Sequence, residues 1–339
     1  MGRPRLTFFC ELKGAELAEL FSQAQVITAL KKLNARVSLG ILDFSAERSE
    51  LVKKLNAAEI PVIAWLLLPQ EQGYWCNANN VPQTFALYSA FQEWTEEQSL
   101  EWAGIGLDFE PDIRELRQMA ANPWQQVPML LGRAFGRNNL GQAATEYDAL
   151  VTRMRVDGYP VDSYQFPFIV DERQTRASLL RKLACLPAIE ADREVLMLYT
   201  SFTTQRTGPG YMWNYAPHAQ AIGVGSTGGG VHTGLGEDRM LSWEELARDL
   251  RLAWYWTDEI YVFSLEGCVR EGYVERLTNF VWDKPILIPV ASTLAVKRWR
   301  SALQVLLWIS AHPIWIFGGI LGSYGFYRGL RELVRRRTK

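Results

Sequence analysis

Cysteine and histidine are scarce in this chain of 339 residues, and their scarcity limits the kinds of site that it can build. The four cysteines lie far apart without a Cys-x-x-Cys pair, and the three histidines do not cluster. Neither a zinc site nor a disulfide framework is therefore indicated. We expect no metal and no cofactor.

Net charge is also small, since 36 basic and 37 acidic residues leave −1. This balance hides an asymmetry, because nine Lys or Arg and one acid fall between Lys297 and Lys339 and leave about −9 on the preceding residues. An acidic body is not typical of nucleic-acid binding, so no nucleic-acid partner is expected. The sequence before Glu11 lacks a long apolar run, and no secretory signal is predicted.

Strand and helix patterns alternate regularly along the chain. Eight short apolar or alternating runs predict strands, at 6–12, 36–43, 61–68, 103–110, 162–168, 194–202, 219–224 and 259–266. Segments with helical spacing separate them, and a long insertion follows the fourth run. Eight such pairs predict a (β/α)8 TIM barrel, which we assign to residues 1–283.

The fourth strand carries the clearest functional pattern. Alternation places Ile105, Leu107 and Phe109 on one side, toward the helices. Asp108 and Glu110 fall on the other side, toward the barrel axis, at the strand end where barrels build their active sites. The alternative is that these two acids only end the strand and cap the next segment.

The same alternation selects polar side chains at other strand ends. They are Glu11, Asp43, Gln165, Tyr199 or Thr200, Ser264 and Glu266. Because the first and eighth strands are neighbours in a closed barrel, Glu11 and Glu266 should lie close together. Acids at four strand ends predict a functional cleft, with a solvated acidic rim as the alternative. A divalent cation held by Glu11, Asp43, Asp108, Glu110 and Glu266 is a further hypothesis.

Two segments resemble motifs of the family-18 glycoside hydrolases, the chitinases and their relatives. The fourth-strand motif of that family, D-x-x-D-x-D-x-E, places its acids here at Ala103, Gly106, Asp108 and Glu110, of which the last two match. Segment 197–200, Met-Leu-Tyr-Thr, resembles the family's M-x-Y-D without the final acid. The likeness covers the barrel plan and these two segments, and it points to the wider TIM-barrel glycosidase superfamily.

The resemblance implies roles for three residues. Glu110 would be the general acid that protonates the leaving oxygen, while Asp108 and Tyr199 would hold a substrate acetamide. A second interpretation pairs Glu110 with Glu266, because strands 4 and 8 face each other across the barrel. That placement suits the wider carboxyl separation, roughly 6.5–9.5 Å, of inverting enzymes. The predicted catalytic residues are Glu110, Asp108, Tyr199 and Glu266.

Aromatic residues are frequent at strand ends and in the loops beyond them, where flat apolar faces could stack on sugar rings. They are Trp65, Tyr74, Trp75, Trp124, Tyr211, Trp213 and Tyr215. The predicted substrate-binding residues are Glu11, Asp43, Trp65, Gln165 and Trp213, with packing of the loops as the alternative role of the aromatic residues. A glycine-rich run at 223–234 lacks the following helix of a dinucleotide site, which leaves a lid or a phosphosugar ligand as its uses.

The C-terminal region differs in composition from the barrel. Residues 302–327 carry no charge and are numerous enough for a helix to cross a bilayer. Basic residues flank this stretch, and Trp299, Tyr324 and Tyr327 lie near its ends, as interfacial anchors do. A hairpin broken at His312-Pro313 is the alternative. We assign 284–300 to a linker, 301–328 to a transmembrane or membrane-associated helix and 329–339 to a basic tail.

Together these features predict a membrane-anchored, glycoside hydrolase-like protein that acts on or binds a glycan. The absence of an export signal favours a cytoplasmic barrel, although six basic residues after the apolar stretch against three before it favour the opposite orientation. The acids missing at positions 103, 106 and 200 favour the alternative function. That alternative is a catalytically inactive barrel that binds a glycan or scaffolds a membrane assembly.

Overall fold

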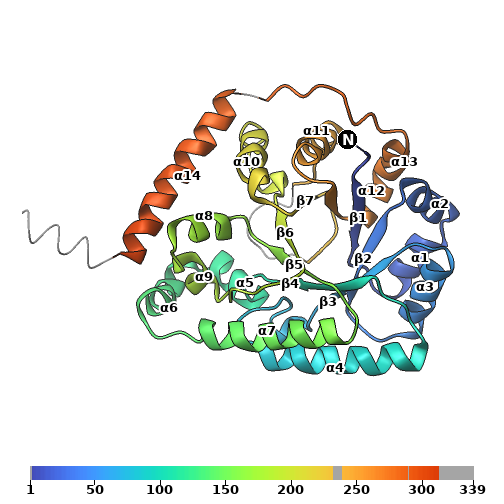
Figure 1. Cartoon of the computed structure of the whole chain (residues 1–339), viewed down its shortest axis with the longest axis horizontal. Coiled ribbons are helices and arrows are strands. Elements are labelled where there is room, and N and C mark those ends of the chain that lie inside the picture. Colours follow the sequence, from blue (N-terminus) through green and yellow to red (C-terminus); the bar gives the residue numbers. More distant parts are fainter. Residues whose placement is uncertain (1, 232–238, 289, 313–339) are drawn as a thin grey trace, which may run out of the picture.

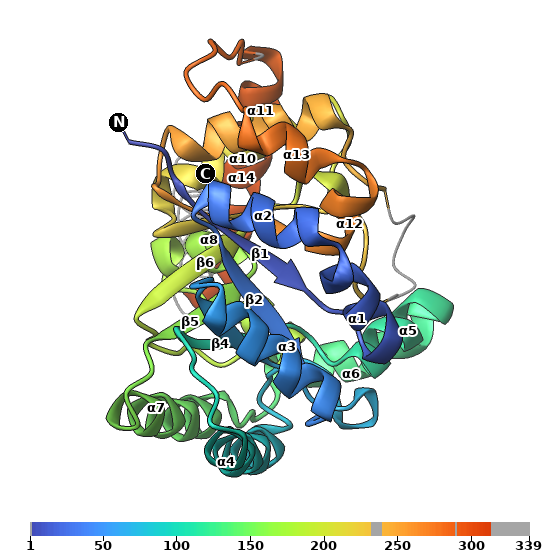
Figure 2. The ribbon, with the colours of Figure 1, turned by 90° about the vertical axis from the view of Figure 1, so that its right-hand side faces the viewer.

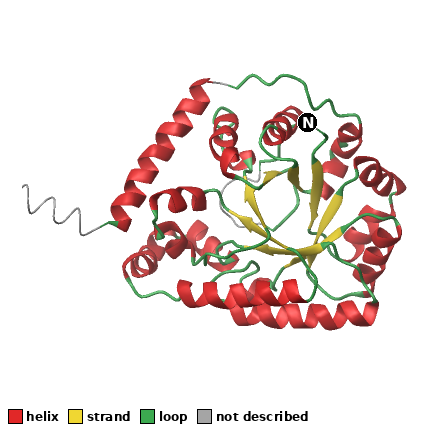
Figure 3. Cartoon of the chain, viewed as in Figure 1, coloured by secondary structure: helices red, strands yellow, loops and turns green. Residues whose placement is uncertain are grey.

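The computed structural model describes residues 2–231, 239–288 and 290–312. Eight parallel strands pair in chain order, and the eighth pairs with the first, which closes a barrel (Figure 1). Helices surround the strands on the outside (Figure 3), and α2 and α3 lie over β1 and β2 (Figure 2). The predicted (β/α)8 fold is therefore confirmed.

The strands are β1 (Arg5–Cys10), β2 (Arg36–Ile41), β3 (Val62–Leu66), β4 (Gly104–Asp108), β5 (Val161–Gln165), β6 (Arg193–Met197), β7 (Ala221–Gly225) and β8 (Glu259–Phe263). The helices are α1 (Gly14–Ser22), α2 (Ala24–Leu33), α3 (Ala46–Ala57), α4 (Val81–Gln98), α5 (Ile113–Ala121), α6 (Pro123–Phe135), α7 (Leu140–Val156), α8 (Phe168–Thr175), α9 (Leu179–Ala184), α10 (Gly208–Tyr215), α11 (Trp243–Trp254), α12 (Leu265–Arg270), α13 (Tyr273–Thr278) and α14 (Val290–Ala311).

Alternation along the strands divides the core into two parts. Side chains on the outer face of the ring, such as Ile105 and Leu107 of β4, pack with the helices in one large apolar cluster. Side chains on the inner face form a smaller cluster rich in aromatic rings. Within it, the ring of Phe9 meets those of Trp65 and Tyr164 edge-on, with centres 5.1 and 4.8 Å apart. The barrel interior is therefore packed up to the strand ends.

Gly106 on β4 faces the barrel axis and leaves room for a side chain from the neighbouring strand. Tyr164 of β5 fills this space, because a Cβ added to Gly106 would lie 2.7 Å from Tyr164 Cζ. The Tyr164 hydroxyl lies 2.8 Å from Ser38 Oγ on β2, so the tyrosine spans the interior. The position at which the family-18 motif has an acid is thus occupied from β5.

Gly106→Ala should lower the free energy of unfolding by about 1–3 kcal/mol, because the added methyl group overpacks a filled interior. Urea unfolding would measure the change. Gly141→Ala in α7 is the matched control, since no atom outside its own helix lies within 4 Å of the added Cβ, and it should change stability by less than about 1 kcal/mol. An equal effect of both substitutions would contradict the close packing of Tyr164 against Gly106.

Two connections differ from the sequence-based expectation. The predicted strand 259–266 ends at Phe263, because Ser264 Oγ accepts a hydrogen bond from the Gly267 amide at 3.2 Å and caps α12. Glu266 therefore lies in a helix and not at a strand end. The insertion after β4 forms two helices, α5 and α6.

Helix α14 lies outside the ring, against α8 and α10 (Figure 1). Its Arg300 is buried and donates hydrogen bonds at 2.8 and 3.0 Å to Asp171 of α8. The guanidinium carbon lies 4.0 Å from the ring centre of Tyr215 on α10. Gln304 donates to the same carboxylate at 2.8 Å. Residues 290–300, expected as part of a linker, are therefore helical and packed on the barrel.

The part of the chain that the structure describes has no helix that combines the length and the apolar character needed to cross a bilayer. Of the predicted membrane segment 301–328, residues 301–311 belong to α14. Residues 313–328 and the basic tail 329–339 lie outside the described residues.

Candidate active site

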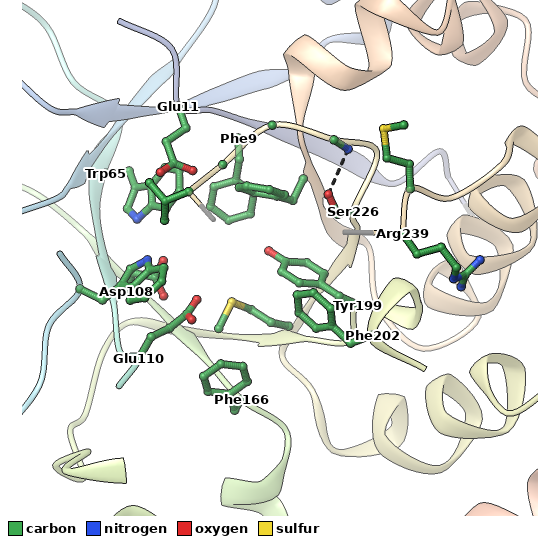
Figure 4. A pocket seen from close by; sticks show the side chains of 18 of the residues that line it. Phe9, Glu11, Trp65, Asp108, Glu110, Phe166, Tyr199, Phe202, Ser226 and Arg239 are labelled. Carbon is green, nitrogen blue, oxygen red and sulfur yellow. Dashed lines mark hydrogen bonds between the residues drawn. The ribbon is translucent and has the colours of Figure 1, made fainter. Parts of the chain in front are cut away.

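A cavity of about 410 Å³ lies at the carboxyl ends of the strands (Figure 4). Among the described residues, every strand except β2 supplies lining side chains at its end or just beyond it. They are Phe9 and Glu11 for β1, Trp65 for β3, Asp108 and Glu110 for β4, Phe166 for β5, Met197 and Tyr199 for β6, Ser226 for β7 and Phe263 for β8. The volume falls within the range of small-molecule sites, roughly 300–1,000 Å³.

Asp108 and Glu110 enter the cavity from β4, as the alternation predicts. Asp108 is 3% exposed, and its Oδ1 has no hydrogen-bond partner among the described residues. The indole nitrogen of Trp65 is also buried without such a partner there. The Trp65 indole lies near enough to Asp108 to lower its pKa, so this acceptor and this donor lie side by side in the cavity, where a polar group of a ligand can complete their hydrogen bonding.

Glu11 follows β1 and lines the same cavity. Its carboxylate accepts a hydrogen bond from the hydroxyl of Tyr74, in the loop after β3. In Figure 4, Glu11 and Glu110 lie at the two ends of one wall of the cavity with Asp108 between them, and Tyr199 faces this wall. Three carboxyl groups from two strands therefore share one small enclosed space.

Burial raises the pKa of all three carboxyl groups. The pKa of Glu110 rises from its usual 4.5 to about 8, through burial and the charge of Glu11. Burial also raises the pKa of Glu11 to about 8, an effect that exceeds the lowering by the hydrogen bond from Tyr74, and the charge of Glu266 adds a smaller rise. The pKa of Asp108 is raised by burial, by Glu110 and by Glu11. At neutral pH the cavity therefore holds protons that are available for general acid catalysis.

The raised pKa values make the stability of the fold depend on pH. The folded chain keeps protons on Glu11 and Glu110 between pH 4.5 and about 8, where the unfolded chain has released them, so stability should fall as pH rises through this range. Glu110→Gln removes one such group, and its melting temperature should exceed that of the wild type at pH 8 by about 2–4 °C or more and match it at pH 4. Glu50→Gln, at an exposed position, is the control and should show no such pH-dependent difference. A constant offset between Glu110→Gln and wild type at all pH values would contradict the raised pKa.

Aromatic rings form much of the remaining wall. The Tyr199 ring lies 5.8 Å from those of Phe263 and Phe202, measured between ring centres. Trp75 and Phe166 also line the cavity. Apolar ring faces beside a few polar groups are typical of pockets that bind a small, partly apolar ligand such as a sugar ring.

The wall beyond β7 consists largely of glycine. Gly228, Gly229 and Gly230 line the cavity with φ of 107°, 88° and 84°, a left-handed backbone that favours glycine. Arg239 and Arg270 lie in the same lining, and the Arg239 guanidinium pairs with a carboxylate of α11. The end of the glycine-rich run, residues 232–234, lies outside the described residues, so the expected lid is not described.

Asp43 and Gln165 do not line the cavity, so their predicted placement in the substrate site is wrong. Asp43 is paired with an arginine, and Gln165 is buried. Asp43 belongs to the phase of β2 that faces the helices and forms an ion pair of 3.1 Å with buried Arg48. Despite partial burial, hydrogen bonds from Arg48 and Ser45 lower the pKa of Asp43 to about 2. Gln165 is buried one position out of phase with Tyr164, and Phe166 takes its expected place in the lining.

Glu266 and Trp213 also lie outside the lining. The backbone of Gly229 covers Glu266, because a Cβ added to this glycine would lie 3.0 Å from Glu266 Cδ. Trp213 of α10 packs on Tyr255 and Trp256, with ring centres 5.5 and 5.3 Å away, beside a separate hollow. Of the predicted site residues, those that the structure brings together are Glu110, Asp108, Tyr199, Glu11 and Trp65.

The residues that sequence reasoning missed are mainly aromatic and backbone groups. Phe263 lies in the inner phase of β8, together with Tyr261, but the even positions of that strand suggested Ser264 and Glu266 instead. Phe202 follows β6 on a short turn that no periodicity marks. For the cation hypothesis, the described residues contain no group of three or more His, Cys, Asp or Glu side chains placed to hold a metal ion.

A closed barrel with a carboxyl-lined cavity at the strand ends defines this chain as a (β/α)8 protein with a candidate acid/base site. No family model matches it, and no curated protein matches its sequence. Solved structures with a similar fold include a tryptophan synthase complex from Pyrococcus furiosus. The two chains are 12% identical, the alignment covers 82% of this chain and 96% of that chain, and the TM-score is 0.43. Another is D-psicose 3-epimerase with D-tagatose from Clostridium cellulolyticum H10, which is 8% identical. That alignment covers 82% of this chain and 99% of that chain, with a TM-score of 0.44. These likenesses are remote and carry no argument about function.

Proposed function

We propose that this chain is a glycoside hydrolase and that Glu110 is its general acid. The observation that carries the proposal is the entry of Glu110 and Asp108 from one strand into an aromatic-walled cavity, where burial raises the pKa of Glu110 to about 8. A carboxyl group that is protonated at neutral pH can donate its proton to a glycosidic oxygen as the bond breaks.

The acetamide-assisted chemistry implied by the family-18 resemblance has less support. Tyr199 and Asp108 do line the cavity together. However, the Tyr164 ring fills the space beside Gly106, and Thr200 turns away from the cavity to donate a hydrogen bond to Asp249 of α11. The partners that would tune Asp108 are therefore absent, and we propose a mechanism that uses the protein's own carboxyl groups.

Turnover of a panel of glycosides by the wild type and by Glu110→Gln tests the proposal. Loss of hydrolysis of glycosides with poor leaving groups in the variant supports it, and equal activity on those substrates removes Glu110 from the mechanism. The second candidate is a glycan-binding barrel without catalysis, which the absence of acids at positions 106 and 200 favours. Oligosaccharide binding that persists in Glu110→Gln, with no turnover by either protein, would support that candidate.

We also propose that the C-terminal region holds the barrel at a membrane, with the barrel on the cytoplasmic side. The outward side of α14 is apolar near its end, where Leu306, Trp308 and Ile309 are exposed. The basic side chains of Lys297 and Arg298 are exposed earlier on the same helix. The sequence continues without charge to position 327, so an apolar helix face leads directly into an apolar segment.

The full chain should float with vesicles of phosphatidylcholine and phosphatidylglycerol and resist an alkaline carbonate wash. Ile316→Arg should release a large part of it, because an arginine at the middle of a membrane helix costs about 2.5–3.5 kcal/mol. Val281→Arg, an exposed apolar position on the barrel, is the control and should stay with the vesicles. Recovery of the unmodified full chain in the soluble fraction would contradict membrane attachment.

A further inference from the structure

We propose that Glu11 is the second catalytic carboxylate, which activates the water that attacks the sugar on the face opposite Glu110. The inference rests on the proposed function and adds to it an inverting mechanism. In this role Glu11 replaces Glu266, the acid that the sequence pattern pairs with Glu110.

The position of Glu11 fits this role. Glu11 continues the inner phase of β1 after Thr7 and Phe9, and its carboxylate lines the same cavity as Glu110. Strands β1 and β4 are separated in the ring by β2 and β3. Figure 4 shows the two side chains reaching the cavity from different strands, with Trp65 and Asp108 between them. Two carboxyl groups that enter from separate strands can lie on opposite faces of one bound sugar ring.

Hydrogen bonding distinguishes the two carboxyl groups. Glu11 accepts a hydrogen bond from the hydroxyl of Tyr74, which stabilises the ionised form of the carboxylate. Burial raises the pKa of Tyr74, so this hydroxyl stays protonated and remains a donor. No described residue donates a hydrogen bond to Glu110, and its protonated form is correspondingly favoured. Because the pKa of each group is raised to about 8, the pair starts to ionise near that pH, and the hydrogen bond from Tyr74 then favours the charge on Glu11 and the proton on Glu110.

Glu266 is excluded from contact with substrate by the backbone above it. It lies on α12 beneath Gly229, and neither of its carboxyl oxygens has a hydrogen-bond partner among the described residues. The charge of Glu266 raises the pKa of Glu11, although Glu266 itself does not line the cavity. Glu266 is therefore a neighbour of the proposed base and not a group that reaches the reacting atoms.

The proposed step is balanced with water as the only co-reactant. Glu11 takes a proton from water while the water oxygen forms a bond to the anomeric carbon. The bond from that carbon to the leaving oxygen breaks, and the leaving oxygen takes the proton of Glu110. The products are a sugar of inverted configuration and the released alcohol. Solvent then removes the proton from Glu11 and returns one to Glu110.

The test uses glycosides with good and with poor leaving groups that the wild type hydrolyses, and three measurements: the configuration of the first product, kcat and the pH–rate profile. Proton NMR at early times should show the anomer of inverted configuration as the first product. Glu11→Gln should lower kcat by about 10²-fold or more on substrates with good and with poor leaving groups alike, because both need the activated water. Glu110→Gln should impair only the substrates with poor leaving groups. Tyr74→Phe should raise the pKa of the acidic limb of the pH–rate profile, since Glu11 loses the donor that stabilises its anion.

Glu97→Gln, at an exposed position on α4, is the control and should keep kcat within a few-fold of the wild type. Thermal unfolding of each variant separates loss of catalysis from loss of folding. A first product of retained configuration, or full activity of Glu11→Gln, overturns the role of Glu11 while leaving Glu110 as the acid. Failure of the wild type to hydrolyse any glycoside overturns the proposed function and this inference with it.

Discussion

Glu110→Gln is expected to slow the hydrolysis of glycosides with poor leaving groups by roughly 10²- to 10⁴-fold, the usual contribution of a positioned general acid. The amide keeps the size of the side chain but has no acidic proton to donate. An activated aryl glycoside leaves without protonation, so its hydrolysis should remain close to the wild-type rate. The values of kcat/KM for this pair of substrates measure the difference directly.

The pH dependence gives an independent check of the same residue. Because burial raises the pKa of Glu110 to about 8, wild-type activity on the poor leaving group should decline above this pH as the acid ionises. That alkaline limb should be missing in Glu110→Gln. Glu97→Gln, an exposed position on α4, serves as control and should behave as the wild type. Equal slowing of both substrates in Glu110→Gln would indicate a binding role and contradict acid catalysis.

Arg300→Met should lower the free energy of unfolding by about 3–5 kcal/mol, the cost of leaving a buried carboxylate without its partner. Asp171 is fully buried and accepts hydrogen bonds from Arg300 at 2.8 and 3.0 Å. The remaining donors, Tyr215 and Gln304, do not supply a compensating charge. Helix α14 should then detach from the barrel, which protection of its amides from hydrogen exchange would reveal.

Two further variants show whether the ion pair is the cause. Asp171→Asn combined with Arg300→Met should recover much of the lost stability, because no unpaired charge stays buried. Arg298→Met, at an exposed position on the same helix, should change stability by less than about 0.5 kcal/mol. A similar loss for Arg298→Met and Arg300→Met would contradict a specific role of the buried pair.

The barrel was predictable from sequence because eight strand patterns alternate with helix patterns at regular spacing. Strand β4 was assigned to the correct phase because Ile105, Leu107 and Phe109 mark the side that packs on helices. The same rule was available for β2, where Val37, Leu39 and Ile41 mark the outer side and Asp43 continues it. The apolar phase of β2 therefore places Asp43 on the outer side, although its polar side chain at a strand end suggests the cavity.

Other parts of the site could not be obtained from alternation. Strand β5 carries polar residues on both faces, so the sequence does not reveal that Tyr164 faces inward and Gln165 outward. The displacement of Glu266 depends on the cap that Ser264 provides to α12, which ends β8 early. The hydrogen bond from Tyr74 to Glu11 joins two residues that are 63 positions apart in the sequence. Tyr74 lies in the loop after β3, and Glu11 lies at the end of β1. Such contacts follow from tertiary packing and leave no local pattern.

The most direct measurement of the central claim is the protonation state of Glu110, followed by infrared difference spectroscopy between wild type and Glu110→Gln from pH 4 to pH 10. The account predicts the carbonyl band of a protonated carboxylic acid at pH 7 that is missing in the variant and disappears with a midpoint near pH 8. A midpoint close to 4.5, or no carboxylic acid band assigned to Glu110 at pH 7, would contradict the assignment of this residue as the general acid.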